Sequence, residues 1–306
     1  MDKSYADTVR LLLAVAPDVF ANDIFAMKGG TAINLFMQDM PRLSVDIDVV
    51  YLPWQTPRED ALRAINQELA AISERVESLG VHTRLVRSGE LGDTKLIVEN
   101  ETSQVKIEVN VVFRGTVLPV ERRQLCARTG DLFGVEFDVP TLAPDELYAG
   151  KLTAALDRQH PRDLFDVWQL YETGGITDGM VECFVVYLAG HNRPIHEVLF
   201  GNDKNIAAEY DRAFMGMTEV ACPLSTLLDA RAQLRRELPA RLSVAHKQFL
   251  EGLAWARPDW SLLQCQHVAQ LPALQWKLRN LETFRKRRPE DFASQAGELE
   301  RLLSQV

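Results

Sequence analysis

The segment from Lys28 to Tyr51 constrains this chain most, because it joins a glycine turn to a strand-like run that carries two aspartates. Residues two apart on a β-strand point to the same face, so Asp46 and Asp48 share one face while Ile47 and Val49 point toward the core. Two carboxylates on an otherwise apolar strand are costly unless a cation lies between them. For a site made of oxygen ligands we expect Mg²⁺, with Mn²⁺ as the alternative. The pattern therefore predicts a metal site.

The glycine turn lies directly before a helix-like segment. Gly29, Gly30 and Thr31 follow the apolar run 24–27 and precede residues 32–36. Backbone N–H groups at the start of a helix can receive a phosphate group. The turn therefore predicts a phosphate cradle close to the two aspartates.

These motifs resemble those of polymerase-β-like nucleotidyltransferases, and in particular those of the AbiEii/AbiGii toxin family, the nucleotidyltransferase halves of bacterial toxin–antitoxin systems. The resemblance begins with KGGTA and RLSVDIDVVY, continues through DELYAGKLTAALDRQHPRDLFDVWQLY and extends to LPALQWKLRNLETF. It covers nearly the whole chain, and the ordered set is more specific than any one motif. It implies an α/β (α+β) fold, in which a mixed sheet with flanking helices is followed by a helical C-terminal domain.

Composition is that of a globular protein with a large core. The 306 residues are 46% hydrophobic and 25% charged, and this length favours two domains. No run of about 18 apolar residues occurs and the first residues are polar, so we expect a cytoplasmic protein without a membrane partner. The four cysteines are far apart in the sequence, which argues against a thiolate metal site or disulfides. A net charge of −9 argues against a protein coated in nucleic acid but allows a local basic cleft.

Periodicity predicts the remaining elements. Amphipathic spacing predicts a helix from Tyr5 to Ala16, ending before Pro17, and a longer helix from Arg58 to Leu79. Alternation predicts an antiparallel meander and one later strand, with the aspartate strand near the sheet centre; these runs are Val81–Val86, Lys95–Glu99, Gln104–Phe113 and Gly130–Val139. Later helices are expected at 178–188, 223–238, 240–255, 272–284 and 289–303. We place the domains at 1–174, which holds the nucleotidyltransferase core, and 175–306.

A third acid is expected on a neighbouring strand. Lys106, Glu108 and Asn110 share one face of the run 104–113, and alternation alone is equally consistent with a strand that has one solvated face. The resemblance implies a third carboxylate beside the first two, and Glu108 is the only acid in this run. It is therefore the candidate third metal ligand or general base.

A lysine and two aspartates lie on the two helices that the resemblance also covers. A lysine such as Lys151 is ordinarily solvated, but the resemblance implies that it neutralises charge on the leaving pyrophosphate. Asp163 and Asp166 lie three apart on one helical face. Asp163 could simply interact favourably with the dipole of its helix. Asp166 lies among large apolar residues and needs a partner, either Lys151 or Arg162. Which aspartate is essential stays open.

The resemblance implies two-metal transfer of a nucleoside monophosphate from an NTP, with release of pyrophosphate. Asp46, Asp48 and Glu108 would bind the metal ions, and Lys151 and Asp166 would complete the catalytic set. Further residues are expected to contact the nucleotide: Lys28, Gly29, Gly30, Thr31, Arg42, Ser44 and Asp163. Ser44, on the same face as the acids, is either a phosphate contact or a modification site.

The acceptor follows from the resemblance alone. Relatives modify the 3′ end of tRNA, which blocks aminoacylation and growth, and are opposed by an antitoxin protein encoded nearby; such systems are also associated with phage defence. Alternatives are transfer to a protein or small-molecule hydroxyl, and a non-catalytic nucleotide-binding partner protein. Candidate RNA contacts, which could equally be solvated charges, are Arg231, Arg235, Arg236, Arg241 and the run 285–288.

Overall fold

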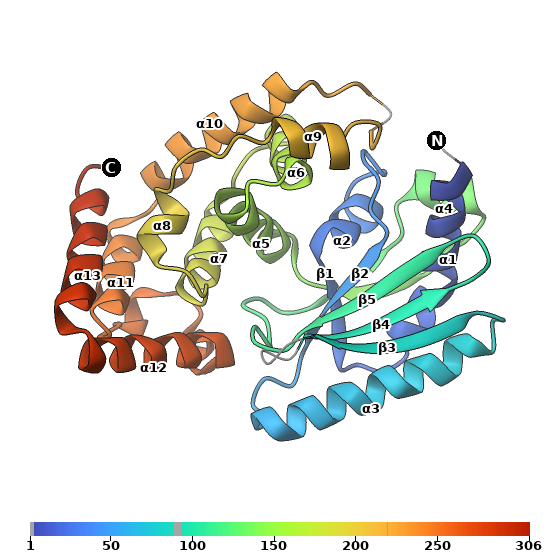
Figure 1. Ribbon diagram of the computed structural model, residues 1–306, viewed down its shortest axis with the longest axis horizontal. Helices are drawn as coiled ribbons and strands as arrows, with labels where there is room; N and C mark the ends of the chain where they lie inside the picture. Colours follow the sequence, from blue (N-terminus) through green and yellow to red (C-terminus); the bar gives the residue numbers. More distant parts are fainter. Residues whose placement is uncertain (1–2, 89–92, 219) are drawn as a thin grey trace. The chain divides into compact units, whose positions relative to one another are not determined.

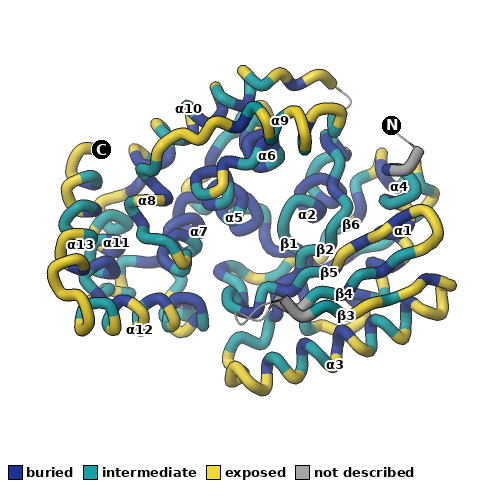
Figure 2. Tube along the Cα trace, viewed as in Figure 1, coloured by how far each residue is buried: buried dark blue, intermediate teal, exposed yellow. Residues whose placement is uncertain are grey.

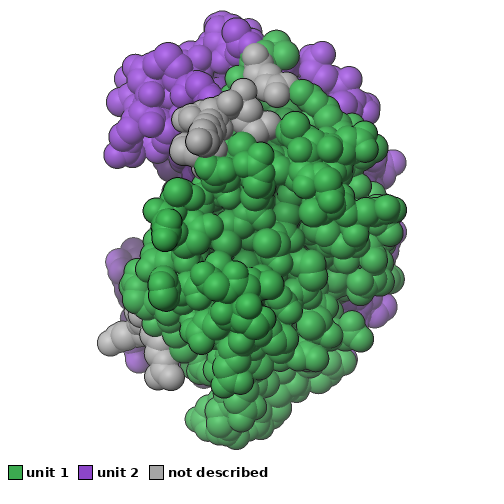
Figure 3. Space-filling model, turned by 90° about the vertical axis from the view of Figure 1, so that its right-hand side faces the viewer, with its two compact units in different colours: residues 1–143, 217–220 green, residues 144–216, 221–306 purple. Residues whose placement is uncertain are grey.

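The computed structural model describes residues 3–88, 93–218 and 220–306 (Figure 1). The chain divides into two compact units, residues 1–143 with 217–220 and residues 144–216 with 221–306, which are coloured separately in Figure 3. The division follows Ala143 rather than residue 174, because α5 (Pro144–Asp157) packs extensively against α7 (Asp178–Ala189) in the second unit.

The first unit is built on a mixed sheet of seven strands. The strands are β1 (Phe25–Lys28), β2 (Asp46–Tyr51), β3 (His82–Ser88), β4 (Asp93–Glu99), β5 (Gln104–Asn110), β6 (Glu121–Gln124) and β7 (Asp138–Thr141). Their order is β3-β4-β5-β2-β1-β7-β6, so the aspartate strand β2 is the central one. It pairs antiparallel with β1 and parallel with β5, and β3, β4 and β5 form the expected antiparallel meander. The predicted α/β class is confirmed.

The two faces of the sheet differ sharply in polarity. Figure 2 shows how far each residue of the chain is buried. On β2 the side chains of Ile47 and Val49 are fully buried, and on β5 Ile107 is buried in the same way. The alternate residues of these strands are polar and at least partly exposed over most of their length. The helices α1 (Lys3–Val19) and α3 (Arg58–Glu77) pack against each other and against the strands, whereas α2 (Gly29–Phe36) packs on β1 and β2. One face of the sheet therefore belongs to the core and the other presents charges.

Several predicted boundaries in the first unit are wrong, and the strand expected at 104–113 already ends at Asn110. Helix α1 continues through Pro17 to Val19; a proline costs a helical hydrogen bond, but Ala16 and Val19 are fully buried, and their packing holds the last turn in place. The expected strand at 130–139 begins as the helix α4 (Ala127–Phe133), which ends at Gly134 with a φ of 68°, and the strand starts only at Asp138. A left-handed glycine ends the helix.

The second unit is helical. Besides α5 and α7 it contains α6 (Pro161–Glu172), α8 (Ile195–Leu199), α9 (Ala207–Ala213), α10 (Leu224–Ala240), α11 (Val244–Ala254), two 3₁₀ turns (Trp260–Leu262 and Gln266–Gln270), α12 (Pro272–Arg287) and α13 (Pro289–Leu303). The five helices predicted from the sequence are all present. Among the described residues, no helix combines the length and the apolar character needed to cross a bilayer. The four cysteines are free thiols.

Three of the arginines expected to contact RNA instead bond within the second unit. Arg231 is buried and donates to Gln159 Oε1 at 3.0 Å and to the carbonyl of Lys204 at 2.7 Å. Arg235 pairs with Asp203 at 2.7 Å and Arg241 with Asp178 at 2.6 Å; Arg236 is exposed. The guanidinium groups of Arg231, Arg235 and Arg241 therefore tie loops to helices, and contact of these arginines with RNA stays a prediction. The run 285–288 is exposed from residue 286 onward.

We expect Arg231→Ala to lower the free energy of unfolding by about 1–3 kcal/mol, because it removes the hydrogen bonds that Arg231 donates to Gln159 Oε1 and to the carbonyl of Lys204. Arg236→Ala, on the same helix but exposed, should change it by no more than about 0.5 kcal/mol. Urea unfolding of the two variants checks this. Equal stability of both variants and the wild type would show that Arg231 has no structural role.

Candidate active site

The predicted acids of the first unit lie in one row across its sheet. The strand register places Asp48 directly beside Lys28 of β1 on one side and Glu108 of β5 on the other, and Glu108 in turn lies opposite Lys95 of β4. Neighbouring strands are about 4.8 Å apart, and directly paired residues point to the same face. We call Lys28, Asp48, Glu108 and Lys95 the charged row. Asp46 lies on the same face of β2, two residues before Asp48.

At both glycines an added Cβ atom would meet the side chain of a neighbouring residue. Gly29 has a φ of +77°, and a Cβ atom there would lie 2.3 Å from Asp48 Oδ2. A Cβ atom on Gly30 would lie 2.7 Å from Arg42 Nη2 and 3.0 Å from Ser44 Oγ. These contacts are shorter than van der Waals separations, so no side chain fits at either position without movement. The start of α2 is thus held against a carboxylate, a guanidinium and a hydroxyl group.

Thr31 and Tyr5 hold the segment that leads into β2. Thr31 is fully buried; its hydroxyl donates to the carbonyl of Asp46 and lies 3.0 Å from Ser44 Oγ. The hydroxyl of Tyr5 accepts from the Ser44 N–H at 2.9 Å. Burial raises the pKa of Tyr5 to about 12, although its bond to Ser44 and the charge of Arg42 oppose this rise. The Thr31 hydroxyl group therefore bonds to the start of β2. This leaves the backbone N–H of Thr31 for the predicted phosphate cradle. The sequence offers no signal for Tyr5.

The carboxylates of this group have the right chemistry for a hard cation, but Glu108 already has a partner. Asp46 and Asp48 are partly exposed on one face of β2 and supply oxygen donors of the kind Mg²⁺ prefers. Lys95 Nζ donates to Glu108 Oε1 at 2.9 Å. Within the described ranges, no three His, Cys, Asp or Glu residues are arranged to hold an ion. The donor types fit a divalent metal, and Glu108 would have to leave Lys95 to join them.

The second unit holds the predicted lysine and both predicted aspartates together. Lys151 Nζ on α5 lies 2.8 Å from Asp163 Oδ1 and 2.9 Å from Asp166 Oδ2, both on α6. The lysine is 7% exposed and each aspartate 1%. Lys151 is thus not a solvated lysine, and both aspartates, not one of them, bond to it. We call these three residues with Arg158 the lysine group.

Arg158, which sequence reasoning missed, completes the lysine group. Its Nε donates to Asp163 Oδ2 and its Nη2 to Asp163 Oδ1 at 2.9 Å. Burial by itself would raise the pKa of the Asp163 carboxyl, but the charge of Lys151 and the hydrogen bonds from Arg158 hold it well below its usual range. Asp163 is therefore ionised at neutral pH. Two cations and two carboxylates balance one another inside this unit.

The turn that carries Arg158 is fixed by its neighbour Gln159. Gln159 has a φ of 54° and is buried. Its side chain donates to the carbonyl of Asn202 at 2.8 Å and accepts from the Lys204 N–H at 2.9 Å, besides the bond from Arg231. A non-glycine residue in the left-handed region is costly unless its surroundings hold it there. The same bonds thus place Arg158 next to Asp163.

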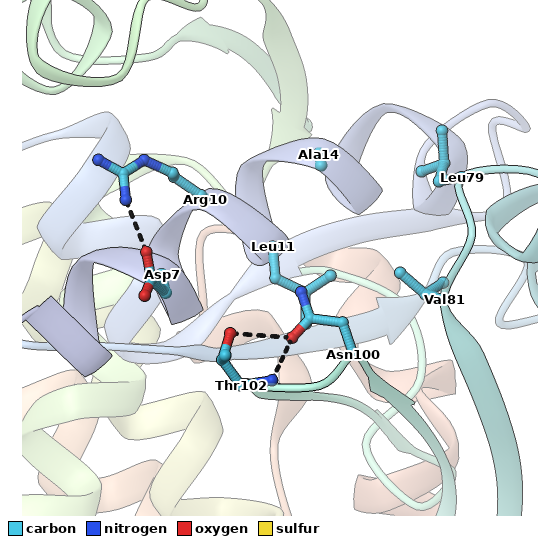
Figure 4. A pocket seen from close by; sticks show the side chains of 8 residues that line it. All are labelled: Asp7, Arg10, Leu11, Ala14, Leu79, Val81, Asn100 and Thr102. Carbon is cyan, nitrogen blue, oxygen red and sulfur yellow. Dashed lines mark hydrogen bonds and ion pairs between the residues drawn. The ribbon is translucent and has the colours of Figure 1, made fainter.

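The predicted residues therefore form two sets, one in each unit. The first unit holds Asp46, Asp48 and Glu108 with the glycine turn, Lys28, Arg42 and Ser44, and the second holds the lysine group. A cavity of about 370 Å³ in the first unit contains none of them (Figure 4). There Arg10 pairs with Asp7 at 2.7 Å, and the side-chain carbonyl group of Asn100 accepts from Thr102, so the polar groups drawn are bonded to each other.

We expect Gly29→Ala to destabilise the protein more than Gly80→Ala does. Gly80 has nearly the same φ, +78°, and a Cβ atom there would meet no described atom within 4 Å, so alanine costs only the left-handed conformation, about 1–2 kcal/mol. Gly29→Ala adds the clash with Asp48 and should cost at least about 1 kcal/mol more. Urea unfolding measures both. Equal costs would contradict the close approach of Gly29 to Asp48.

We expect Asp163→Asn to lower stability at pH 7 by about 3–5 kcal/mol, because it leaves Lys151 and Arg158 with one carboxylate fewer. The folded-state pKa of Asp163 is below the ordinary value of about 3.9. Its contribution is therefore complete above about pH 4 and is lost as pH falls toward the folded-state pKa. Unfolding free energies measured from pH 7 to pH 3 should fall less steeply for Asp163→Asn than for the wild type. Parallel curves would contradict the assignment.

Comparison with known proteins identifies the family of this chain. The family model described as the nucleotidyl transferase AbiEii toxin of type IV toxin–antitoxin systems matches residues 10–280. Among solved structures, MenT4, a nucleotidyltransferase toxin from Mycobacterium tuberculosis H37Rv, is similar with a TM-score of 0.60 and 16% identity, covering 90% of this chain and 92% of that one. At this identity the likeness concerns the fold. A search of curated proteins gave no match. The chain belongs to the AbiEii family of nucleotidyltransferase toxins of type IV toxin–antitoxin systems.

Proposed function

We propose that this toxin transfers a nucleoside monophosphate from an NTP to the 3′ end of tRNA in the cytoplasm, releases pyrophosphate, and so blocks translation and growth until its antitoxin counteracts it. The observation that carries the transfer step is the pair Asp46 and Asp48 on one face of the central strand, with Gly29 in contact range of Asp48. The tRNA acceptor is proposed from the membership of this chain in the AbiEii family.

In this proposal Asp46 and Asp48 hold Mg²⁺, and Glu108 takes part in binding a second ion. When bound, the metal ions supply charge neutralisation at the phosphates and activation of the attacking hydroxyl. The chain itself orients the substrate. The proposal is supported by the oxygen donor set and by the position of Glu108 beside Asp48.

Phosphate binding is assigned to the start of α2. The N-cap residue of this helix, Lys28, makes no capping hydrogen bond with its side chain, and backbone N–H groups at a helix N-terminus attract anions. Arg42 and Lys28 add positive charge, since the Arg42 guanidinium packs against Gly30 and Lys28 pairs in register with Asp48. Ser44 lies close enough to Gly30 to contact the same phosphate.

Lys151 is assigned to the charge that develops on the leaving pyrophosphate. Asp163 and Asp166 position its ammonium group by direct ion pairs. A lysine fixed in this way needs no reorganisation during the reaction, which is the condition under which a charge stabilises a transition state best. Both aspartates are positioning residues in this proposal.

The test incubates purified protein with Mg²⁺ and each α-labelled NTP in turn, together with total tRNA or with lysate protein. We expect label on tRNA, reduced at least about 100-fold by Asp46→Ala or Asp48→Ala, the scale on which loss of an electrostatic catalytic group acts. Asp60→Ala is the matched control, because Asp60 is an exposed aspartate of α3 that pairs with its helix neighbour Arg63. Circular dichroism confirms that each variant is folded.

Other outcomes would redirect the proposal. Label on protein would move the acceptor to a protein hydroxyl, and label retained by folded Asp46→Ala and Asp48→Ala would exclude the metal site as described. No label on tRNA or protein would favour a small-molecule acceptor or a non-catalytic nucleotide-binding partner protein over tRNA modification.

A further inference from the structure

We propose that Lys95 is a resident counter-ion of Glu108, which competes with divalent metal for this carboxylate and thereby weakens metal binding in the absence of nucleotide. The inference rests on the proposed function, since it concerns the same metal site. It assigns a positioning role to a residue that the sequence motifs do not include.

The strand register determines which charges compete for Glu108. Glu108 lies between Asp48 on β2 and Lys95 on β4, and it is directly paired with both. Toward Asp48 it meets a like charge, and toward Lys95 an opposite one. Like charges directly opposite one another on adjacent strands are unfavourable, whereas opposite charges attract. In the metal-free protein the carboxylate of Glu108 is therefore drawn to Lys95, and the 2.9 Å bond shows this state.

The exposure of the pair makes this state reversible. The side chains of Lys95 and Glu108 are 31% and 35% exposed. An ion pair in contact with water contributes little to stability, so it can open without disturbing the sheet. The pair of Lys151 with Asp163, which is almost fully buried, is the opposite case. The two pairs are thus suited to different tasks, one to exchange and the other to permanent support.

A divalent ion bound by Asp46 and Asp48 reverses the balance at Glu108. Such an ion would cancel the charge of the two aspartates, so that Asp48 would no longer repel Glu108, and its coordination shell would accept a third oxygen donor. Lysine is a compact charge on a flexible stem, so Lys95 can then leave its carboxylate without backbone movement. Metal binding must break the ion pair between Lys95 and Glu108. The free energy of metal binding is therefore less favourable by the free energy of that pair.

The test measures Mn²⁺ binding directly, by calorimetric titration of the full chain without nucleotide, so that its readout does not depend on activity. We expect Lys95→Met, which keeps the aliphatic stem, to lower the Mn²⁺ Kd about two- to five-fold, the range into which the energy of a partly exposed pair converts. Lys95→Arg restores a cation and should return the Kd toward the wild-type value.

Two further variants separate the pair from a general effect of charge. In a Glu108→Gln background Lys95→Met should leave the Kd unchanged, because the competition has been removed. Arg63→Ala is the matched control, since Arg63 also pairs with one carboxylate, that of Asp60, and is 67% exposed. It should leave the Kd at the wild-type value. Circular dichroism and urea unfolding show whether each variant is folded.

The possible results distinguish this inference from the proposed function. An unchanged or higher Kd for folded Lys95→Met, or an equal decrease in the Glu108→Gln background, overturns the counter-ion role while the metal site stands. Binding that Asp46→Ala does not weaken, or no binding by any variant, overturns the metal site and this inference with it.

Discussion

The central constraint on this structure is that two carboxylates lie on the strand at the middle of the sheet. Because β2 is hydrogen-bonded to β1 on one side and β5 on the other, its backbone cannot shift to relieve charge or crowding. The neighbouring segments adapt instead. Gly29 has no side chain where Asp48 lies, and Gly30 has none beside Arg42. The hydroxyl group of Thr31 donates a hydrogen bond to the carbonyl of Asp46. The lack of side chains at the glycine turn thus follows from the groups that lie beside it.

The second unit handles buried charge in the opposite way. Asp163 and Asp166 meet Lys151 directly, and Arg158 supplies a second cation, so the charges within the group cancel. A group that is balanced in this way requires no ligand in order to be stable. On the first unit, Asp46 and Asp48 instead face partly exposed positions beside a third acid. The charged row of the first unit is partly exposed to water, whereas Lys151, Asp163 and Asp166 are buried and depend on their ion pairs.

Local patterns in the sequence predicted the parts of this protein that depend on local physics. Alternation along β2 and β5 predicted which residues are buried. The glycine turn predicted a helix directly after it, at residues 32–36, and the helix in fact begins at Gly29. The need of buried Asp166 for a partner predicted Lys151 or Arg162, and the structure shows an ion pair with Lys151, which Asp163 shares. What failed depends on distant contacts. Nothing in the run of arginines indicates that Arg231 lies against Gln159, and nothing near Tyr5 indicates its bond to Ser44.

The charged row illustrates how the core determines a site that the sequence cannot fully specify. Alternation alone predicts the face on which Glu108 lies, but its neighbours depend on the register between strands. The pairing that places Ile47 beside Ile107, and Ile107 beside Leu96, also places Asp48 beside Glu108 and Glu108 beside Lys95. A slip of one residue would bring apolar side chains to the charged face and charges into the core. Burial of these three apolar residues therefore fixes the register, and the register determines whether Glu108 neighbours both an acid and its competing lysine.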